Sequence, residues 1–334
     1  MSGPTIAFSM YAGLEAAAFR PGHLDRLAAL GDVLDPLAVE SLPPERAAAV
    51  LAEAEVLVGH WGCARLDVDL LDRAPRLRML AYAAGTVRDV VTAETFARLD
   101  RVTSAAAANA EPVAEYTLAA ILWANKDAFA ERERARGIDV PRPVRRRPVG
   151  NWNKRIGLIG ASHVGRAVAR LLGPFRHLEV VVSDPYLDEA GAAALGARLV
   201  DLPELMSTSD VVSVHAPWLP ETERMIGAPE LAAMRDGAVL INTSRGALVD
   251  HDALVPEVES GRLTAVLDVT EPEPLPPDHP LLHLPGCVVT PHLAGSQGTE
   301  LSRLAELAID EVERWATGAA ARYPVTAADL GRIA

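Results

Sequence analysis

The chain has 334 residues, 49% of them hydrophobic and 23% charged, and its formal net charge is −13 at pH 7. This length is more than one small hydrophobic core requires and favours two domains. The negative charge argues against nucleic acids and anionic membranes as partners, because both repel an acidic surface, but a small anionic ligand can still bind where the local field is positive.

Targeting signals and metal-binding patterns are not evident in the sequence. No apolar run reaches the roughly 18 residues that a membrane span needs, and the N-terminal residues lack the basic region and apolar core of a secretion signal. The two cysteines, Cys63 and Cys287, stand in unrelated contexts without metal-ligand spacing. We therefore expect a cytoplasmic protein with free thiols and no bound metal.

The first part of the chain alternates predicted strands with predicted helices, which is typical of a parallel α/β unit. The strands are expected at Thr5–Ser9, Glu55–Gly59 and Leu77–Tyr82, the helices at Gly22–Leu30 and Glu45–Ala54, and a turn-rich connection at Pro36–Pro44. The last two strands lead into two loops, which consist of His60, Trp61 and Gly62 and of Ala84, Gly85 and Thr86. Ligands of open α/β sheets collect at such carboxyl ends, so both loops are candidate pocket walls.

A long helix is predicted from Glu111 to about Arg134, because its acidic start and basic end suit the helix dipole. The following residues, Arg136–Pro148, are rich in proline and arginine and are expected to form a loop. Seven arginines lie between Arg132 and Arg147. We interpret them as a solvated helix end and loop, with a subunit contact or an anion-attracting rim as the alternatives.

The stretch from Lys154 to Asp184 has the organisation of a dinucleotide-binding βαβ unit. Its parts are a strand at Arg155–Ile159, a turn at Gly160–Gly165, a helix at Val164–Leu172, a second strand at Leu178–Ser183 and the acidic Asp184.

The residue types in this unit have separate physical roles. Gly160 allows the chain to turn sharply off the strand, and Gly165 allows the helix to pack close to the sheet. The free N–H groups at the helix start, around His163 and Val164, would face a pyrophosphate. Asp184 can accept hydrogen bonds from both ribose hydroxyls and would repel a 2′-phosphate, which favours NAD over NADP.

One position departs from the dinucleotide-binding pattern. Ser162 occupies the place of the middle glycine, where the backbone approaches the pyrophosphate. The pattern leaves open how this serine affects NAD affinity, and an ordinary strand–turn–helix without a ligand is the alternative for this stretch alone.

Four further strands are predicted downstream, each followed by polar residues or by proline. The strands and the residues that follow them are Asp210–His215 with Ala216 and Pro217, Ala238–Asn242 with Thr243, Ser244 and Arg245, Thr264–Leu267 with Asp268, and Cys287–Thr290 with Pro291 and His292. A proline-rich run that holds Glu273 lies between the last two strands, and a helix is expected at Glu300–Trp315.

Arg245, Glu273 and His292 fall at or beyond predicted strand ends, and together they suit hydride transfer to a carbonyl. Taken singly, each has an ordinary explanation as a surface, solvated or capping residue. A doubly wound topology would bring them to one crevice beside a nicotinamide. His292 could then protonate the developing alkoxide, Arg245 could hold a neighbouring carboxylate, and Glu273 would favour the imidazolium form of the histidine. No serine nucleophile elbow, zinc motif or P-loop competes with this interpretation.

Over essentially its whole length, the chain resembles the D-isomer-specific 2-hydroxyacid dehydrogenase family. The segments that carry the resemblance are Gly160–Gly165 with Asp184, His215–Pro217 with Glu221 and Thr222, Ile241–Asp250, Leu267–Pro276 and Thr290–Ser296. The resemblance implies an α/β fold of two Rossmann-like doubly wound domains, in which an NAD-binding domain at 106–292 is inserted into a flavodoxin-like substrate domain at 1–105 and 293–334. It also implies a homodimer through the nucleotide domain.

By position, the resemblance implies that Arg245 orients the substrate, His292 is the acid/base and Glu273 is its carboxylate partner, while Asp268 holds the nicotinamide carboxamide. The other residues expected to line NAD are Gly160, Ser162, His163, Val164, Gly165, Asp184, His215, Ala216, Pro217, Thr222, Thr243, Ser244 and Gly295. The residues expected to contact the substrate are Trp61, Ala84, Gly85, Thr86 and Arg88.

The first-domain loop departs from the family pattern, which has an acidic residue two positions after its glycine. Here Val87 and then Arg88 follow Gly85. Arg88 either meets a second acidic group on the substrate or points to solvent. Trp61 either walls the side-chain pocket or packs in the core.

The leading hypothesis is an NAD-dependent dehydrogenase that interconverts a 2-keto acid and a D-2-hydroxy acid. Two alternatives stay open: an NAD-sensing regulator without catalysis, and a family member with an unusual hydride donor such as phosphite. Formate-oxidising members lack the glutamate–histidine pair, so Glu273 argues against that activity. The pattern does not indicate which keto acid is used or in which direction the reaction runs.

Overall fold

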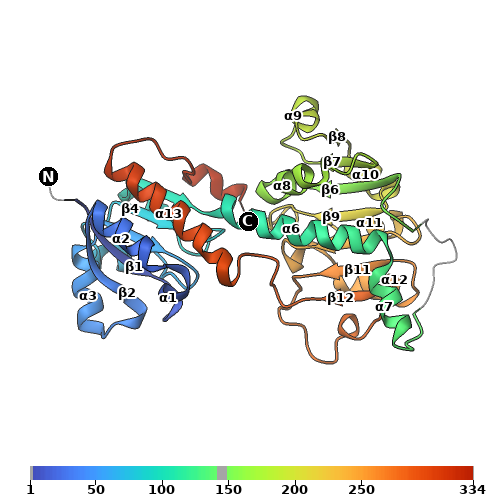
Figure 1. The fold of residues 1–334 in the computed structure, drawn as a ribbon, viewed down its shortest axis with the longest axis horizontal. Helices are drawn as coiled ribbons and strands as arrows, with labels where there is room; N and C mark the ends of the chain where they lie inside the picture. The colour runs from blue at the N-terminus through green and yellow to red at the C-terminus, as the bar shows by residue number, and fades with distance from the viewer. Residues whose placement is uncertain (1–2, 141–148, 334) are drawn as a thin grey trace. The chain divides into compact units, whose positions relative to one another are not determined.

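The structure is a computed structural model that describes residues 3–140 and 149–333. Of the loop expected at Arg136–Pro148, residues 141–148 lie outside the described part of the chain. The chain forms two compact units: the first ends at Ala110 and resumes from Ser296 to Ile333, and the second runs from Glu111 to Gly295 (Figure 1).

The first unit is built on a five-stranded parallel sheet with the order β2-β1-β3-β4-β5. This is the strand order of the flavodoxin-like fold. The strands are β1 (Thr5–Ser9), β2 (Asp32–Ala38), β3 (Val56–Gly59), β4 (Met79–Tyr82) and β5 (Arg101–Ser104). The helices are α1 (Leu14–Ala18), α2 (Pro21–Leu30), α3 (Pro44–Glu53), α4 (Val68–Arg73), α5 (Ala93–Arg98) and α13 (Leu301–Ala316), with 3-10 turns at Val39–Ser41, Gly298–Glu300 and Ala327–Gly331.

The sheet of the first unit is buried on both faces. Successive side chains of a strand point to opposite sides, and each side packs into its own hydrophobic core. Ile6 and Phe8 of β1 belong to the core on one face, which includes residues of α13, and Ala7 belongs to the core on the other face. Helix α13 returns from the end of the chain to pack against α1, α2 and β4 of the same unit (Figure 1). Arg26 and Asp310 join α2 and α13 by an ion pair of 2.7 Å.

The second unit is built on a seven-stranded sheet with the order β12-β11-β10-β9-β6-β7-β8, in which every pair is parallel. Read from β6, the first six strands follow the Rossmann order 3-2-1-4-5-6. The strands are β6 (Lys154–Ile159), β7 (Leu178–Ser183), β8 (Arg198–Leu199), β9 (Val211–Val214), β10 (Val239–Asn242), β11 (Thr264–Leu267) and β12 (Cys287–Val289). The α-helices are α6 (Ala106–Asn125), which begins before the unit boundary, α7 (Ala128–Ala135), α8 (His163–Leu172), α9 (Glu189–Ala194), α10 (Leu202–Thr208), α11 (Ala228–Ala233) and α12 (His251–Glu259), with 3-10 turns at Gly246–Leu248 and Pro280–Leu282.

These two sheets confirm the predicted fold class, with three local differences from the prediction. The edge strand β2 (Asp32–Ala38) was not predicted, and its end takes the start of the connection predicted at Pro36–Pro44, whose remainder is a 3-10 turn and loop as expected; an edge strand tolerates Pro36 because its outer N–H groups pair with no neighbour. Strand β5 was not predicted. The helix predicted from Glu111 to about Arg134 is two helices, α6 and α7, separated at Asp127, which has a φ of 55°. No glycine or proline marks that break in the sequence.

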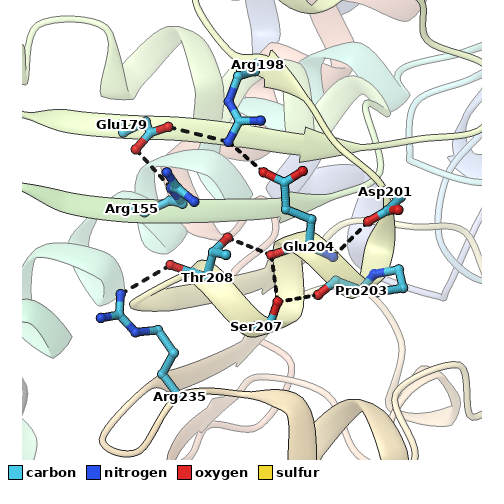
Figure 2. Close-up of polar contacts among 9 residues, drawn as sticks. All are labelled: Arg155, Glu179, Arg198, Asp201, Pro203, Glu204, Ser207, Thr208 and Arg235. Carbon is cyan, nitrogen blue, oxygen red and sulfur yellow. Dashed lines mark hydrogen bonds and ion pairs between the residues drawn. The ribbon is translucent and has the colours of Figure 1, made fainter.

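The amino ends of the strands in the second unit are tied by ion pairs (Figure 2). Arg155 Nε lies 2.9 Å from Glu179 Oε2 between β6 and β7, and Arg198 of β8 reaches Glu204 of α10 at 2.8 Å. A hollow of about 830 Å³ opens at this edge and includes Arg155, Glu179 and Arg235 in its walls. It lies at the amino ends of the strands, whereas the predicted site residues follow the carboxyl ends.

Candidate active site

The three residues predicted to be catalytic follow three neighbouring parallel strands. Arg245 follows β10, Glu273 follows β11 and His292 follows β12. The carboxyl ends of these strands are level, because Asn242 pairs with Leu267 and Leu267 pairs with Val289. The segments that carry the three predicted residues therefore start side by side at one edge of the sheet.

His292 and Glu273 are in direct contact. The Nδ1 atom of His292 lies 2.6 Å from Oε1 of Glu273. When Nδ1 carries the proton of this hydrogen bond, Nε2 is the ring atom left to exchange a proton with a ligand. The side chains are 49% and 39% exposed, so water screens part of the attraction between their charges.

The segment that carries His292 is fixed by Asp268. The backbone N–H of His292 donates to the carbonyl of Asp268 at 2.8 Å. His292 has a φ of 51°, a backbone conformation that residues other than glycine rarely adopt without support from their neighbours. The carboxylate of Asp268 is buried and accepts from Thr290 Oγ1 at 2.6 Å, Leu293 N at 2.9 Å and Ala294 N at 2.8 Å. A carboxylate has about four acceptor sites, so roughly one is left for a ligand.

The turn that carries Arg245 packs backbone to backbone against the loop that leads to Glu273. A Cβ atom added at Gly246 would lie 2.0 Å from the carbonyl carbon of Thr270 and 2.6 Å from the nitrogen of Glu271. Only glycine allows this approach. Arg245 itself donates from Nη1 to the carbonyl of Ser244 at 2.7 Å.

Asn242 supports the same turn and was not predicted as a site residue. Its side-chain Nδ2 donates to the carbonyl of Arg245 at 2.8 Å, and its Oδ1 accepts from Ser244 N at 3.0 Å. The side chain is fully buried at the end of β10. An asparagine that ends a strand before a turn is the sequence signal that could have identified it.

The glycine turn after β6 has the close contacts that its sequence pattern requires. Gly160 has a φ of 96°, and a Cβ atom there would lie 2.8 Å from the nitrogen of Ala216. A Cβ atom at Gly165 would lie 2.1 Å from the carbonyl oxygen of Gly160. The turn therefore packs tightly against the end of β9 and the start of α8, while Ser162 and His163 at the helix start are exposed.

Ser162 uses its hydroxyl within the protein. It is the N-cap of α8, where Oγ accepts from Gly165 N at 3.4 Å, and it donates to the carbonyl of His215 at 2.9 Å. Asp184 also holds the turn, because its carboxylate accepts from Ala161 N and from Tyr186 N, both at 2.7 Å. Each carboxylate oxygen of Asp184 retains acceptor capacity for a ligand.

The remaining predicted cofactor residues lie in the same unit, around the ends of β9 and β10. His215 is buried, and burial lowers its pKa to about 3, so the ring is neutral. Neither ring nitrogen of His215 has a hydrogen-bond partner among the residues that the structure describes. The polar contacts of its neighbours are Thr222 Oγ1 to the Pro217 carbonyl at 2.6 Å, Ser244 Oγ to the Ala216 carbonyl at 2.6 Å, and Thr243 Oγ1 to Thr117 Oγ1 at 3.1 Å; Val164 and Gly295 are half-buried.

These observations together fit a dinucleotide. The start of α8 presents N–H groups, and Asp184 follows β7. Gly160 and Gly165 stand where a larger side chain would collide with the backbone. The buried neutral ring of His215, whose nitrogens have no partner among the residues that the structure describes, also lies beside the turn.

The residues predicted to bind the substrate lie in the first unit, after β3 and β4. The carbonyl of Ala84 accepts from Ser104 Oγ at 3.3 Å, the carbonyl of Gly85 accepts from the same hydroxyl, and Thr86 Oγ1 accepts from the backbone N–H of Arg88 at 3.2 Å. Trp61 is half-buried and packs edge-on against His60, with ring centroids 4.7 Å apart.

Within residues 3–140 and 149–333, no group of three or more histidine, cysteine, aspartate and glutamate side chains could hold a metal ion. None of the helices there is both long enough and apolar enough to cross a membrane. Cys63 and Cys287 are free thiols, and burial raises the pKa of each to about 12, so neither is a thiolate nucleophile near neutral pH.

Three comparisons relate the chain to known proteins. Residues 118–294 match the model of the D-isomer specific 2-hydroxyacid dehydrogenase NAD binding domain. The chain is 32% identical over 291 residues to D-3-phosphoglycerate dehydrogenase of Mycobacterium leprae, and this match covers 85% of the chain but only 54% of that enzyme. It is 32% identical over 263 residues to glyoxylate reductase of Korarchaeum cryptofilum, covering 74% of the chain and 75% of that enzyme.

A solved structure shares the fold. It is the NAD complex of a D-isomer specific 2-hydroxyacid dehydrogenase from Lactobacillus delbrueckii ssp. bulgaricus, with a TM-score of 0.79, 21% identity, and coverage of 96% of this chain and 100% of that one. The family match extends over more than half of the chain and coincides with the unit that holds the glycine turn and the histidine–glutamate pair. The chain therefore belongs to the D-isomer specific 2-hydroxyacid dehydrogenase family, and its second unit contains the NAD-binding domain of that family.

Proposed function

We propose that the protein interconverts a 2-keto acid and a D-2-hydroxy acid by NAD-dependent hydride transfer. The contact of 2.6 Å between His292 Nδ1 and Glu273 Oε1 is the observation that carries the proposal. It gives the site an acid/base with a defined free nitrogen, and family membership supplies the cofactor class. When bound, NADH supplies the hydride and NAD⁺ accepts it.

His292 moves the proton of the reaction. In reduction, the carbonyl carbon receives the hydride and the carbonyl oxygen receives the proton from Nε2 of the imidazolium, which gives the hydroxyl group. In oxidation the neutral ring takes the same proton back. Glu273 orients the ring for this transfer, because its carboxylate lies 2.6 Å from Nδ1 and leaves Nε2 to face the ligand.

Arg245 is proposed to bind the substrate carboxylate, because it supplies a planar, permanently charged fork that suits a carboxylate. In the first unit, the loop at Ala84, Gly85 and Thr86 is proposed to contact the substrate through its backbone N–H groups. Arg88 would then meet a second acidic group of the substrate.

The cofactor is proposed to be NADH rather than NADPH. Asp184 follows β7, where the adenosine ribose of a dinucleotide lies in Rossmann domains. A carboxylate at this place accepts hydrogen bonds from ribose hydroxyls and repels a 2′-phosphate. We propose that Asp268 holds the nicotinamide carboxamide with the acceptor site that its three internal hydrogen bonds leave.

The first unit is proposed to be the substrate domain, formed by residues 1–105 and 293–334, and residues 106–292 to be the cofactor domain. We also propose a cytoplasmic homodimer that associates through the second unit. Two tryptophans of that unit support the choice, because Trp123 is 54% and Trp152 is 62% exposed. Aromatic residues exposed in this way are enriched at protein interfaces.

The test is oxidation of NADH and NADPH by the purified protein against a panel of 2-keto acids. The panel includes glyoxylate, hydroxypyruvate, branched and aromatic keto acids, and the diacids oxaloacetate and 2-oxoglutarate. The reverse reaction is tried with D-3-phosphoglycerate, because one of the relatives is a D-3-phosphoglycerate dehydrogenase. Glyoxylate is in the panel because another relative is a glyoxylate reductase. Turnover of a diacid or of the phosphorylated acid would support the role of Arg88.

The matched variant is Glu273→Gln, which keeps the shape of the side chain and removes its charge. We expect turnover to fall on the order of tenfold or more, because a charge-assisted hydrogen bond is replaced by a neutral one. NADH binding without turnover on any member of the panel would contradict the proposed reaction and favour an NAD-sensing role. Turnover with NADPH in preference to NADH would contradict the role of Asp184.

A further inference from the structure

His251 holds the loop that leads to Glu273. It is the first residue of α12 and is 6% exposed. The proposed reaction does not use it to bind the substrate or the cofactor. Its Nδ1 atom lies 3.1 Å from the carbonyl oxygen of Glu271 and 3.4 Å from the nitrogen of the same residue. The shorter contact assigns the ring proton to Nδ1, which donates to the carbonyl.

Only Pro272 separates this anchored carbonyl from Glu273. The loop is further fixed by Thr270, whose Oγ1 donates to the carbonyl of Pro272 at 2.9 Å. Gly246 also packs against this loop, because a Cβ atom added there would lie only 2.1 Å from the carbonyl oxygen of Thr270. The position of the Glu273 carboxylate therefore depends on three contacts of residues 270–272, and His251 supplies the one that comes from α12.

The protonation state of His251 suits this role. Burial lowers its pKa, against smaller upward effects of the Glu271 carbonyl and nearby carboxylates, so the ring stays neutral near pH 7. A neutral ring does not compete with His292 for the negative charge of Glu273. Among the described residues, the Nε2 atom of His251 has no hydrogen-bond partner, so the Nδ1 contact with Glu271 is its main polar anchor.

We infer that His251 is a positioning residue: it fixes the backbone of Glu271 so that the carboxylate of Glu273 stays on Nδ1 of His292. The inference rests on the proposed function only in treating His292 as the acid/base of the reaction. The physical basis is the distance dependence of the contact, since a displacement of the loop by about 1 Å is enough to lower turnover on the order of a hundredfold in a preorganised site.

Three variants of the full chain separate positioning from general stability. His251→Leu introduces an apolar side chain of similar size and removes the hydrogen bond. His251→Asn places an amide N–H near the position of Nδ1 and can restore the bond to the Glu271 carbonyl. Val258→Ala is the matched control, because Val258 is 2% exposed in the same helix and packs in the core of the second unit.

The first measurement is the NMR signal of the His292 Nδ1 proton, which a short hydrogen bond to a carboxylate moves far downfield. It needs no substrate, and Glu273→Gln identifies the signal. We expect His251→Leu to lose it, and His251→Asn and Val258→Ala to keep it. Retention of the signal in His251→Leu, or its equal loss in Val258→Ala, would overturn the inference.

The second measurement is the pH profile of kcat and KM with the substrate that the panel identifies. In His251→Leu we expect kcat to fall on the order of tenfold across the pH range and KM to change little. His251→Asn should recover most of kcat. An unchanged profile in His251→Leu would count against positioning. If the parent protein turns over no keto acid but His251→Leu still loses the NMR signal, the proposed function fails and the positioning role stands.

Discussion

The backbone contact between the Arg245 turn and the loop before Glu273 predicts a large effect for Gly246→Ala. The added methyl group would lie 2.0 Å from the carbonyl carbon and 2.1 Å from the carbonyl oxygen of Thr270. Both obstacles are backbone atoms that cannot rotate away. Since non-bonded carbon atoms rest about 3.5 Å apart, the turn or the loop must move by more than about 1 Å.

Two consequences follow, each with its own magnitude. Overpacking of this kind destabilises a protein by about 1–3 kcal/mol. We expect a cost near the upper end of that range, because the added methyl group meets backbone atoms that cannot move aside independently. A displacement of about 1 Å in a preorganised site costs on the order of a hundredfold in turnover. That factor corresponds to about 2.7 kcal/mol of lost transition-state stabilisation. We expect NADH still to bind, because the glycine turn after β6, where the pyrophosphate is proposed to lie, is built from other segments.

Gly22→Ala is the control for the Gly246→Ala experiment. No atom lies within 4 Å of a Cβ atom added at Gly22, and the residue is in helix α2, so this variant should match the parent or exceed its stability by up to about 1 kcal/mol. Steady-state kinetics, NADH fluorescence titration and denaturant unfolding compare the variants with the parent. Parental kcat and parental stability in Gly246→Ala would show that the turn at Gly246 and the loop at Thr270 are not in tight contact.

Three further predictions concern single residues. His292→Ala should lower kcat by about 10²–10⁴-fold and leave NADH affinity nearly unchanged in a fluorescence titration, so near-parental turnover would exclude His292 as the acid/base. Ser162→Gly removes the hydrogen bonds to Gly165 N and the His215 carbonyl and should cost about 1 kcal/mol in unfolding experiments. Calorimetry should find its NADH affinity kept or improved, and loss of binding would show that the pyrophosphate does not lie at this turn. Burial lowers the pKa of His60 to about 4, so the unfolded chain, with an ordinary value near 6.5, binds the proton first and stability falls as pH drops below about 6.5. His60 should account for about 2 kcal/mol of lost stability between pH 8 and pH 5, and His60→Asn, measured by thermal unfolding across that range, should lose less than the parent; equal losses would contradict the assignment.

Local sequence patterns determined the strands on both sides of the glycine turn after β6. The strand predicted at Leu178–Ser183 coincides with β7, and the strand predicted at Arg155–Ile159 lies within β6. A buried parallel strand is a short apolar run between turn residues, and the glycines and Asp184 have fixed offsets from it, so the pattern can be read without tertiary information. The alternation of strands and helices likewise determined the doubly wound α/β class.

The sequence also predicted Arg245, Glu273 and His292 as a set, because residues after successive parallel strands share one edge of the sheet. It could not indicate that His292 has a φ of 51° or that Asp268 uses three hydrogen bonds to hold the segment around it. Nor did any local signal predict the break between α6 and α7 at Asp127, which interrupts a continuous run of helix-forming residues.

Only the tertiary structure showed that Gly246 meets Thr270 and that His251 meets Glu271. These contacts join residues about twenty positions apart, and neither has a periodicity or a spacing that distinguishes it from an ordinary loop. Hydrophobic periodicity and turn residues report how a segment folds on itself, whereas the positions of two loops depend on the register of β10 against β11 and on the packing beneath them. The sequence alone therefore determined which residues reach the edge of the sheet, and packing between distant segments decided how they are held there.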